Sequence, residues 1–161
     1  MQQTNKGLKP LYLEDLQVGR RFLSGRYSID EAQIKAFARE FDPQPFHLDE
    51  TAAEHSFFGG VIASGWHTAA ATMRLLVQSD LRFANGVIGL GGEITWPNPV
   101  RPGDTLQVES EILEIVPSRS KPDRAVVIVR NVTVNQNGEQ VQVLHAKLLV
   151  FKRAADPTAS P

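Results

Sequence analysis

Residues 41–73 read FDPQPFHLDETAAEHSFFGGVIASGWHTAAATM, and this stretch decides how the rest of the chain is interpreted. Its first part places Asp42, two prolines and His47 within six positions. Because a proline disfavours helical backbone in the residue before it, a helix arriving from Ile34 is predicted to end near Asp42. Proline also suits the second position of a turn, and a bend here would bring a carboxylate and an imidazole onto one reactant. The two side chains are therefore a candidate acid–base pair.

The last part of this stretch predicts a buried helix over residues 64–78, which are apolar on nearly every face. Gly65 opens the helix, where backbone N–H groups have no intrahelical partner and lie at the positive end of the helix dipole. The preceding pair, Gly59 and Gly60, permits positive φ or a close approach of another backbone. Ser64 is expected to be the N-cap of the helix.

The remaining pattern predicts an α+β domain. A capping box at Ser28–Glu31, with Asp30–Gln33 as the alternative register, marks the start of the helix that ends near Asp42. A short helix is predicted over residues 49–54. Strands are predicted at Arg20–Ser28, Val87–Trp96, Thr105–Val116, Ala125–Val134 and Val141–Phe151, the last two joined by the hairpin sequence Asn135-Gln-Asn-Gly138.

Length and composition narrow the class of protein. A chain of 161 residues fits one domain, and 42% hydrophobic with 22% charged residues is typical of a soluble globular protein. A net charge of −1 argues against a nucleic-acid partner, and the lack of cysteine excludes disulfides and thiolate metal sites. With no signal sequence and no membrane-spanning run, we expect a cytoplasmic protein without a membrane partner. Residues 1–10 are predicted to be a flexible arm, 11–153 the domain and 154–161 a disordered tail.

Two segments resemble the signature of the MaoC-like dehydratases, the hot-dog-fold family that includes the (R)-specific enoyl-CoA hydratases. The family wording is roughly G-D-x-N-P-h-H-h-D followed by F-x-x-h-I-h-H-G. It is matched by Asp42-Pro-Gln-Pro-Phe-His47 with Leu48-Asp49-Glu50, and by Phe57 through Gly65. Tyr12–Gly19 and Arg101–Leu106 also resemble family stretches. The resemblance implies one hot-dog domain, in which a long buried central helix is wrapped by a curved antiparallel sheet.

The resemblance also implies roles for three residues. Asp42 and His47 would hold a water that adds to C3 of a trans-2-enoyl thioester while a proton reaches C2. The backbone N–H of Gly65 would stabilise the negative charge that builds on the thioester oxygen. The expected partners are an acyl-CoA substrate and a second copy of the chain, with the site near the dimer interface. No metal and no cofactor is expected, coenzyme A being part of the substrate.

The chain departs from the family pattern at four positions: Phe41 replaces Gly, Gln44 replaces Asn, Ser64 replaces His, and Met73 replaces a serine on the central helix. Methionine cannot donate the hydrogen bond of that serine, which lies close to the acid–base pair in some (R)-hydratases. We therefore expect substrate shape or efficiency to differ from a simple short-chain hydratase.

Two alternative functions stay open beside a hydro-lyase acting on an enoyl or 3-hydroxyacyl thioester. A hot-dog thioesterase usually carries a lone acid on the central helix, whereas residues 64–78 contain no Asp or Glu. A non-catalytic subunit that binds acyl thioesters is kept open by the departures at Ser64 and Met73.

Two groups of charged residues have uses that the sequence does not decide. The first, which offers potential metal ligands, has a spacing that matches no common zinc pattern; it is His47, Asp49, Glu50 and His55. The second could bind the phosphates of coenzyme A or merely solvate loops; it is Arg101, Arg119, Lys121 and Arg124.

Overall fold

A computed structural model describes residues 9–154 of the chain. The predicted arm at 1–10 and tail at 154–161 lie almost wholly outside this range. The chain order is a 3₁₀ turn η1 (Leu13–Asp15), β1 (Arg21–Ser28), α1 (Glu31–Phe41), α2 (Pro45–Leu48), α3 (Glu50–Glu54), α4 (Gly65–Val77), β2 (Gly89–Thr95), β3 (Thr105–Pro117), β4 (Arg124–Val134) and β5 (Gln140–Phe151). None of the helices in the described range is long and apolar enough to cross a membrane.

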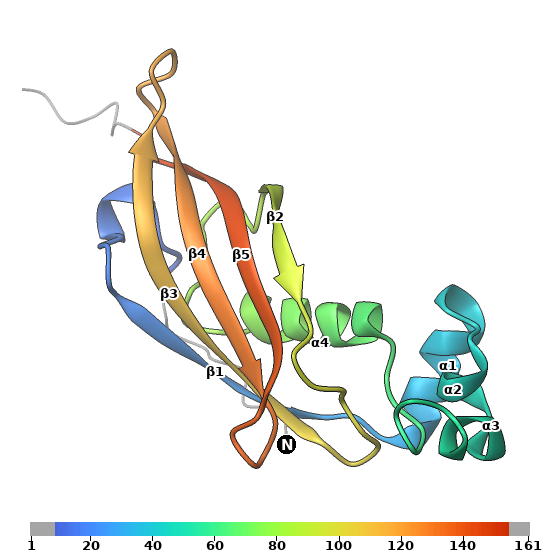
Figure 1. The fold of residues 1–161 in the computed structure, drawn as a ribbon. Coiled ribbons are helices and arrows are strands. Elements are labelled where there is room, and N and C mark those ends of the chain that lie inside the picture. The colour runs from blue at the N-terminus through green and yellow to red at the C-terminus, as the bar shows by residue number, and fades with distance from the viewer. Residues whose placement is uncertain (1–8, 155–161) are drawn as a thin grey trace, which may run out of the picture.

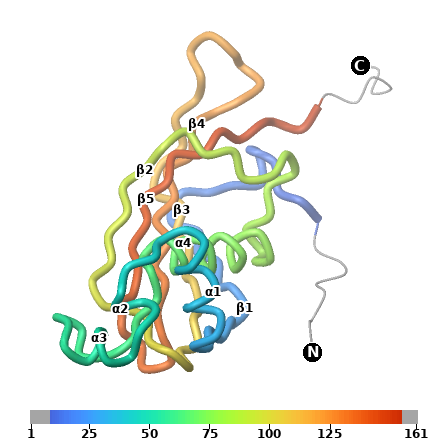
Figure 2. The backbone as a smooth tube through the Cα atoms, turned by 90° about the vertical axis from the view of Figure 1, so that its right-hand side faces the viewer, coloured from blue at the N-terminus to red at the C-terminus, as the bar shows by residue number. Residues whose placement is uncertain are grey.

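The strands form a five-stranded sheet in the order β1-β3-β4-β5-β2, and all neighbours are antiparallel. The sheet curves around α4, which lies against one of its faces (Figures 1 and 2). Helices α1, α2 and α3 gather at one end of the sheet, and the β3–β4 connection lies at the opposite end. The predicted central helix wrapped by a curved antiparallel sheet is confirmed.

Local chemistry decides where α1 begins. The Asp30 carboxylate accepts a hydrogen bond from the backbone N–H of Gln33, and the Gln33 side chain accepts one from the backbone N–H of Asp30, each at 2.8 Å. The capping box therefore uses the second predicted register, and the Ser28–Glu31 register is wrong. Ser28 ends β1 instead, where its hydroxyl lies 2.8 Å from that of Thr105 on β3.

Helix α4 is less buried than the sequence predicts. Its sheet-facing side is buried and includes Thr72, whose hydroxyl lies 2.8 Å from that of Thr133 on β4. Three large apolar side chains on its other side remain exposed: Trp66 by 60%, Met73 by 42% and Val77 by 46%. An apolar composition predicts burial, but it cannot say that the chain itself covers only one side of the helix.

A buried cluster ties the helical end of the molecule to the sheet. It joins Ile34 of α1, Ala53 of α3 and Leu75 of α4 to Val108 of β3 and Val141 of β5. Val100, in the loop after β2, belongs to the same cluster. The elements that carry the predicted site residues are thereby packed into one core.

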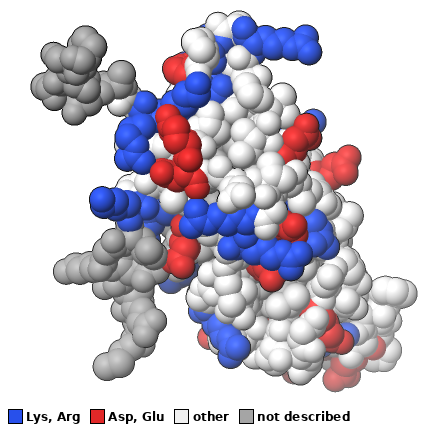
Figure 3. Space-filling view, turned by 90° about the vertical axis from the view of Figure 1, so that its left-hand side faces the viewer, with Lys and Arg blue, Asp and Glu red and all other residues white. Residues whose placement is uncertain are grey.

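The face of the sheet turned away from α4 carries charges that compensate one another. A cross-strand row runs Arg21, Glu111, Arg130, His145 and Glu93 across all five strands. Arg21 pairs with Glu111 at 3.1 Å. Figure 3 shows basic and acidic side chains interspersed over this side of the molecule. Such opposite-charge pairs stabilise neighbouring strands modestly.

Gly92 is predicted to be required where β2 meets β5. A Cβ at this position would lie 2.3 Å from the carbonyl oxygen of His145, so Gly92→Ala must displace one strand. We expect this variant to lose about 1–3 kcal/mol of unfolding free energy in a urea titration. Gly89→Ala, in the same strand with open space around it, is the matched control. Equal stability of the two variants would contradict the close approach.

Candidate functional site

The structure brings Asp42 and His47 together. Asp42 follows the last residue of α1, and His47 lies in α2, which begins at Pro45 because proline is favoured at the first position of a helix. The Nε2 atom of His47 lies 3.2 Å from Oδ2 of Asp42. The predicted bend is present, and a short helix that the sequence did not indicate completes it.

The imidazole of His47 is buried and fixed from both sides. Its Nδ1 lies 2.7 Å from the carbonyl oxygen of Ile62. Because a carbonyl can only accept, Nδ1 carries a proton and donates it. The Nε2 atom is thereby left to face Asp42 and the cavity, the position that a general acid–base group requires.

The carboxylate of Asp42 is partly buried but held in its charged form. Burial alone would raise the pKa of Asp42. Hydrogen bonds from Ser64 and Gln44, together with the charge and hydrogen bond of His47, outweigh burial and lower the pKa below its usual value. The Gln44 amide donates to Oδ1 of Asp42 at 2.7 Å. Asp42 is therefore an anion at neutral pH.

Ser64 connects this carboxylate to the start of α4. Its hydroxyl is buried and accepts a hydrogen bond from the backbone N–H of Trp66 at 3.2 Å, as the predicted N-cap should. The same hydroxyl helps to lower the pKa of the Asp42 carboxyl by stabilising its anionic form. One hydroxyl can donate and accept at once, so both contacts are compatible. The sequence indicated the cap, whereas the contact with Asp42 depends on the fold.

Gly65 lies under an aromatic ring that the sequence did not connect with it. A Cβ at Gly65 would lie 2.8 Å from the indole of Trp96. This indole is held by its Nε1, which donates to Oε1 of the fully buried Gln142 at 3.0 Å. A side chain here would require the indole to shift, and the N–H of Gly65 belongs to the first turn of α4, where N–H groups lack intrahelical acceptors.

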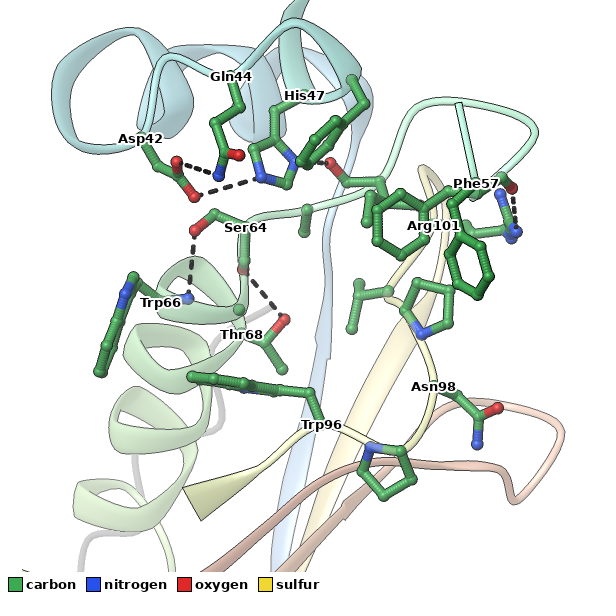
Figure 4. Close-up of a pocket in the computed structure, with 18 residues that line it drawn as sticks. Asp42, Gln44, His47, Phe57, Ser64, Trp66, Thr68, Trp96, Asn98 and Arg101 are labelled. Atoms are coloured by element: carbon green, nitrogen blue, oxygen red, sulfur yellow. Dashed lines mark hydrogen bonds and ion pairs between the residues drawn. The ribbon is translucent and has the colours of Figure 1, made fainter. Parts of the chain in front are cut away.

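A cavity of about 530 Å³ opens beside these residues. Asp42 and His47 lie on one side of it and Arg101 with Phe57 on another, while Trp96 and Trp66 flank the start of α4 (Figure 4). Most of the lining is aromatic or aliphatic. The site thus combines an apolar cavity, a titratable pair and a helix start, as small-molecule sites commonly do.

Met73 lies elsewhere than the resemblance suggests. It does not line the cavity of Asp42 and His47, but borders a separate cavity of about 30 Å³ between α4 and the sheet. In the single chain this side chain thus lies outside the cavity of the acid–base pair, and its effect on substrate shape or efficiency stays a prediction.

The other candidate metal ligands have separate structural uses. Asp49 caps α3 by accepting from the N–H of Ala52 at 2.7 Å, and Glu50 lies 3.3 Å from Nζ of Lys35. Nδ1 of His55 lies 2.7 Å from the carbonyl oxygen of Thr51. Within residues 9–154, no three His, Asp or Glu side chains gather as a metal site would need.

Comparison with known proteins gives consistent results. A domain model described as "MaoC like domain" matches residues 15–137. A 3-hydroxybutyryl-CoA dehydratase of Methylorubrum extorquens is 31% identical over 157 residues, covering 94% of this chain and 92% of that protein. The crystal structure of a MaoC-like dehydratase from Rhodospirillum rubrum has a TM-score of 0.89 and 62% identity, covering 90% of this chain and 99% of that one. The (R)-hydratase PhaJ1 of Pseudomonas aeruginosa has a TM-score of 0.71 and 29% identity, covering 94% and 97%.

Replacing Ser64 with alanine is predicted to raise the pKa of Asp42, because one of the donors that stabilise the anion is lost. An NMR titration of carboxyl carbons measures the pKa of Asp42.

In Ser64→Ala, loss of the N-cap should also cost about 0.5–2 kcal/mol of unfolding free energy. Because the folded-state pKa of Asp42 is lowered, its contribution is present above the unfolded-state pKa and lost as pH falls through the folded-state value. The stability gap between wild type and Ser64→Ala should therefore narrow in acid.

Asp49→Ala is the control for this experiment, since it removes the N-cap of α3 and is expected to leave the pKa of Asp42 unchanged. An Asp42 pKa that is the same in Ser64→Ala and wild type would show that the hydroxyl serves the helix alone.

Proposed function

This chain belongs to the MaoC-like dehydratase family, and from that premise we propose that it is a hydro-lyase acting on a 2-enoyl or 3-hydroxyacyl thioester. Its architecture is the hot-dog fold that the family resemblance implied. The observation that carries the proposal is the contact between His47 and Asp42 at the wall of an apolar cavity. Helix α4 offers no carboxylate, which disfavours the thioesterase alternative.

In the hydration direction, a water molecule is held between Oδ2 of Asp42 and Nε2 of His47. The water oxygen forms a bond to C3 of the substrate as the C2–C3 π electrons move toward the thioester carbonyl. The water takes the place of the direct contact between Nε2 and Oδ2. One water proton passes to Nε2 of the neutral imidazole, which keeps its other proton on Nδ1 against Ile62. The imidazolium then delivers that proton to C2, and the other proton stays on the new hydroxyl. Dehydration follows the same steps in reverse.

The negative charge that develops on the thioester oxygen needs a donor that is already in place. The N–H of Gly65 fulfils this role, because it lies at the positive end of the 13-residue helix α4. Trp96 packs against Gly65, where a Cβ would lie 2.8 Å from the indole. Because Gly65 has no side chain, the thioester oxygen can approach its N–H.

The substrate is proposed to be a coenzyme A thioester, and the catalytic steps need no further cofactor. The dehydratase relative from Methylorubrum extorquens carries 3-hydroxybutyryl-CoA in its name, which supports this choice. The apolar lining of the cavity suits an acyl group, and the titratable pair at its wall suits the polar reacting carbons.

A second copy of the chain is proposed to cover the open side of α4. Trp66, Ala70, Met73 and Val77 are all exposed and recur at helical spacing, so they form one apolar stripe. The neighbouring β2 is an edge strand of the sheet. An apolar stripe beside an unpaired strand edge is what an interface between copies requires.

Asp42→Asn and His47→Ala are each predicted to lower kcat for hydration of crotonyl-CoA by about 10²–10⁴-fold, because each removes one member of the acid–base pair. Loss of the conjugated enoyl-thioester absorbance measures the rate, and circular dichroism checks the fold. His55→Ala, an exposed histidine outside the cavity, should retain activity. Full activity in the two site variants would refute these assignments, and release of free thiol by the wild type would favour a thioesterase.

Met73→Lys is predicted to shift the protein from dimer to monomer in light scattering coupled to size exclusion, because it places a charge in the middle of the apolar stripe. Leu113→Lys, an exposed position on β3, is the matched control and should leave the mass unchanged. A wild type that is monomeric at all concentrations tested would contradict the proposed interface.

A further inference from the structure

Arg101 is the one Lys or Arg side chain, within residues 9–154, that lines the cavity of Asp42 and His47. Its Nη2 donates to the carbonyl oxygen of Phe58 at 2.8 Å. Its Nη1 passes close to Gly60, where a Cβ would lie 3.5 Å from it. The guanidinium is therefore anchored to the Phe58–Gly60 turn, while Arg101 as a whole stays exposed to solvent and open to a ligand (Figure 4).

The charge of Arg101 is not compensated by a carboxylate. Among the ion pairs of the described residues, none includes Arg101. The acid nearest in sequence, Asp104, is engaged elsewhere: Oδ2 accepts from the backbone N–H of Arg101 at 2.9 Å, and Oδ1 accepts from Gln136 at 2.9 Å. A guanidinium has five N–H donors, so Arg101 keeps most of its donors for a ligand.

The other three cations that the sequence left open lie far from the cavity. Arg119 and Lys121 belong to the β3–β4 connection, at the end of the sheet opposite α1–α3 (Figure 1). Arg124 begins β4 at that end and pairs with Asp123 at 2.9 Å. Position thus singles out Arg101 from a group that composition could not divide.

The cavity therefore carries a negative charge on one side and a positive charge on the other. A carboxylate held as an anion lies at Asp42, and an unpaired guanidinium lies at Arg101. An extended ligand with one anionic end would be repelled from the first and attracted to the second. Its neutral reactive group would then face Asp42 and His47.

We propose that Arg101 binds the phosphate at the end of the pantetheine arm of the thioester substrate. This inference rests on the proposed function and deepens it. The same phosphate is present in coenzyme A and in the phosphopantetheine group of an acyl carrier protein, and a planar guanidinium fits it with two parallel hydrogen bonds. The phosphate fixes the direction in which the arm leaves the cavity.

The test compares crotonyl thioesters of coenzyme A, 4′-phosphopantetheine, pantetheine and an acyl carrier protein. Arg101→Gln is expected to raise KM about tenfold for the coenzyme A, 4′-phosphopantetheine and carrier-protein thioesters, which carry the phosphate, with little change in kcat. A tenfold change corresponds to the loss of about one charged hydrogen bond. KM for the pantetheine thioester should not change. Arg101→Lys should recover part of the loss because it keeps the charge, and Arg119→Gln should behave as wild type. For the wild type, kcat/KM is compared between the coenzyme A thioester and the carrier-protein thioester. The substrate with the higher value is the source of the phosphate.

Three results would overturn the proposal. An equal rise in KM for all four thioesters would mean that Arg101 only supports the turn at Phe58. A rise for the coenzyme A thioester but not for the phosphopantetheine one would place the contact at the nucleotide instead. No change for any substrate would remove Arg101 from binding.

Failure of the proposed function is distinguished by calorimetry. If the wild type turns over none of the thioesters, the hydro-lyase is refuted. The phosphate subsite is then tested by calorimetry, which measures the affinity of 4′-phosphopantetheine for the wild type and for Arg101→Gln. Weaker binding to Arg101→Gln than to wild type would support the subsite, and equal affinities would overturn it.

Discussion

The structure around the cavity is organised about one partly buried carboxylate, that of Asp42, whose pKa is lowered by its neighbours. Taking Asp42 partly out of water favours its protonated form, and contacts with three side chains outweigh that preference. They come from three different elements: Gln44 from the loop after α1, His47 from α2, and Ser64 from the cap of α4. The pKa of Asp42 is therefore lowered by contacts that exist only where these elements meet at one point, which links the electrostatics of one side chain to the fold of residues 42–66.

Helix α4 supplies the rigid reference for this meeting point. Its start carries Ser64 and Gly65, its middle is fixed to β4 by the buried contact between Thr72 and Thr133, and the backbone N–H of Ala63 donates to the carbonyl of Val100 at 2.8 Å. Trp96 then presses on the helix start from the side of the sheet. The other polar atom of the buried Gln142 side chain, Nε2, has no hydrogen-bond partner among the described residues. Positioning the indole is therefore achieved at some expense in stability.

The sequence predicted those parts of the site that local backbone chemistry controls. Pro43 ends α1 beside Asp42, and the glycine that opens α4 could be located without any tertiary information. The parts it missed depend on residues distant along the chain: Trp96 and Gln142 are 46 positions apart, and neither belongs to a local motif. The exposure of Met73 was missed for a related reason, because periodicity identifies an apolar face but not what covers it. The family resemblance supplied the roles, whereas the Ser64 contact and the separation of Arg101 from the other cations required coordinates.

Trp66 links the cavity to the apolar stripe on α4. It lines the cavity, its ring meets that of Trp96 edge to face with centroids 5.4 Å apart, and 60% of its surface is exposed in the single chain. A second copy seated on the stripe would cover this exposed ring and so complete one wall of the cavity. Water would then be excluded from the side of the site where the proposed mechanism assigns Gly65 to a developing negative charge, and a hydrogen bond to that charge is stronger in such surroundings. The apolar surface that leaves α4 incompletely buried in one chain would thus, in a dimer, strengthen the hydrogen bond to the developing negative charge.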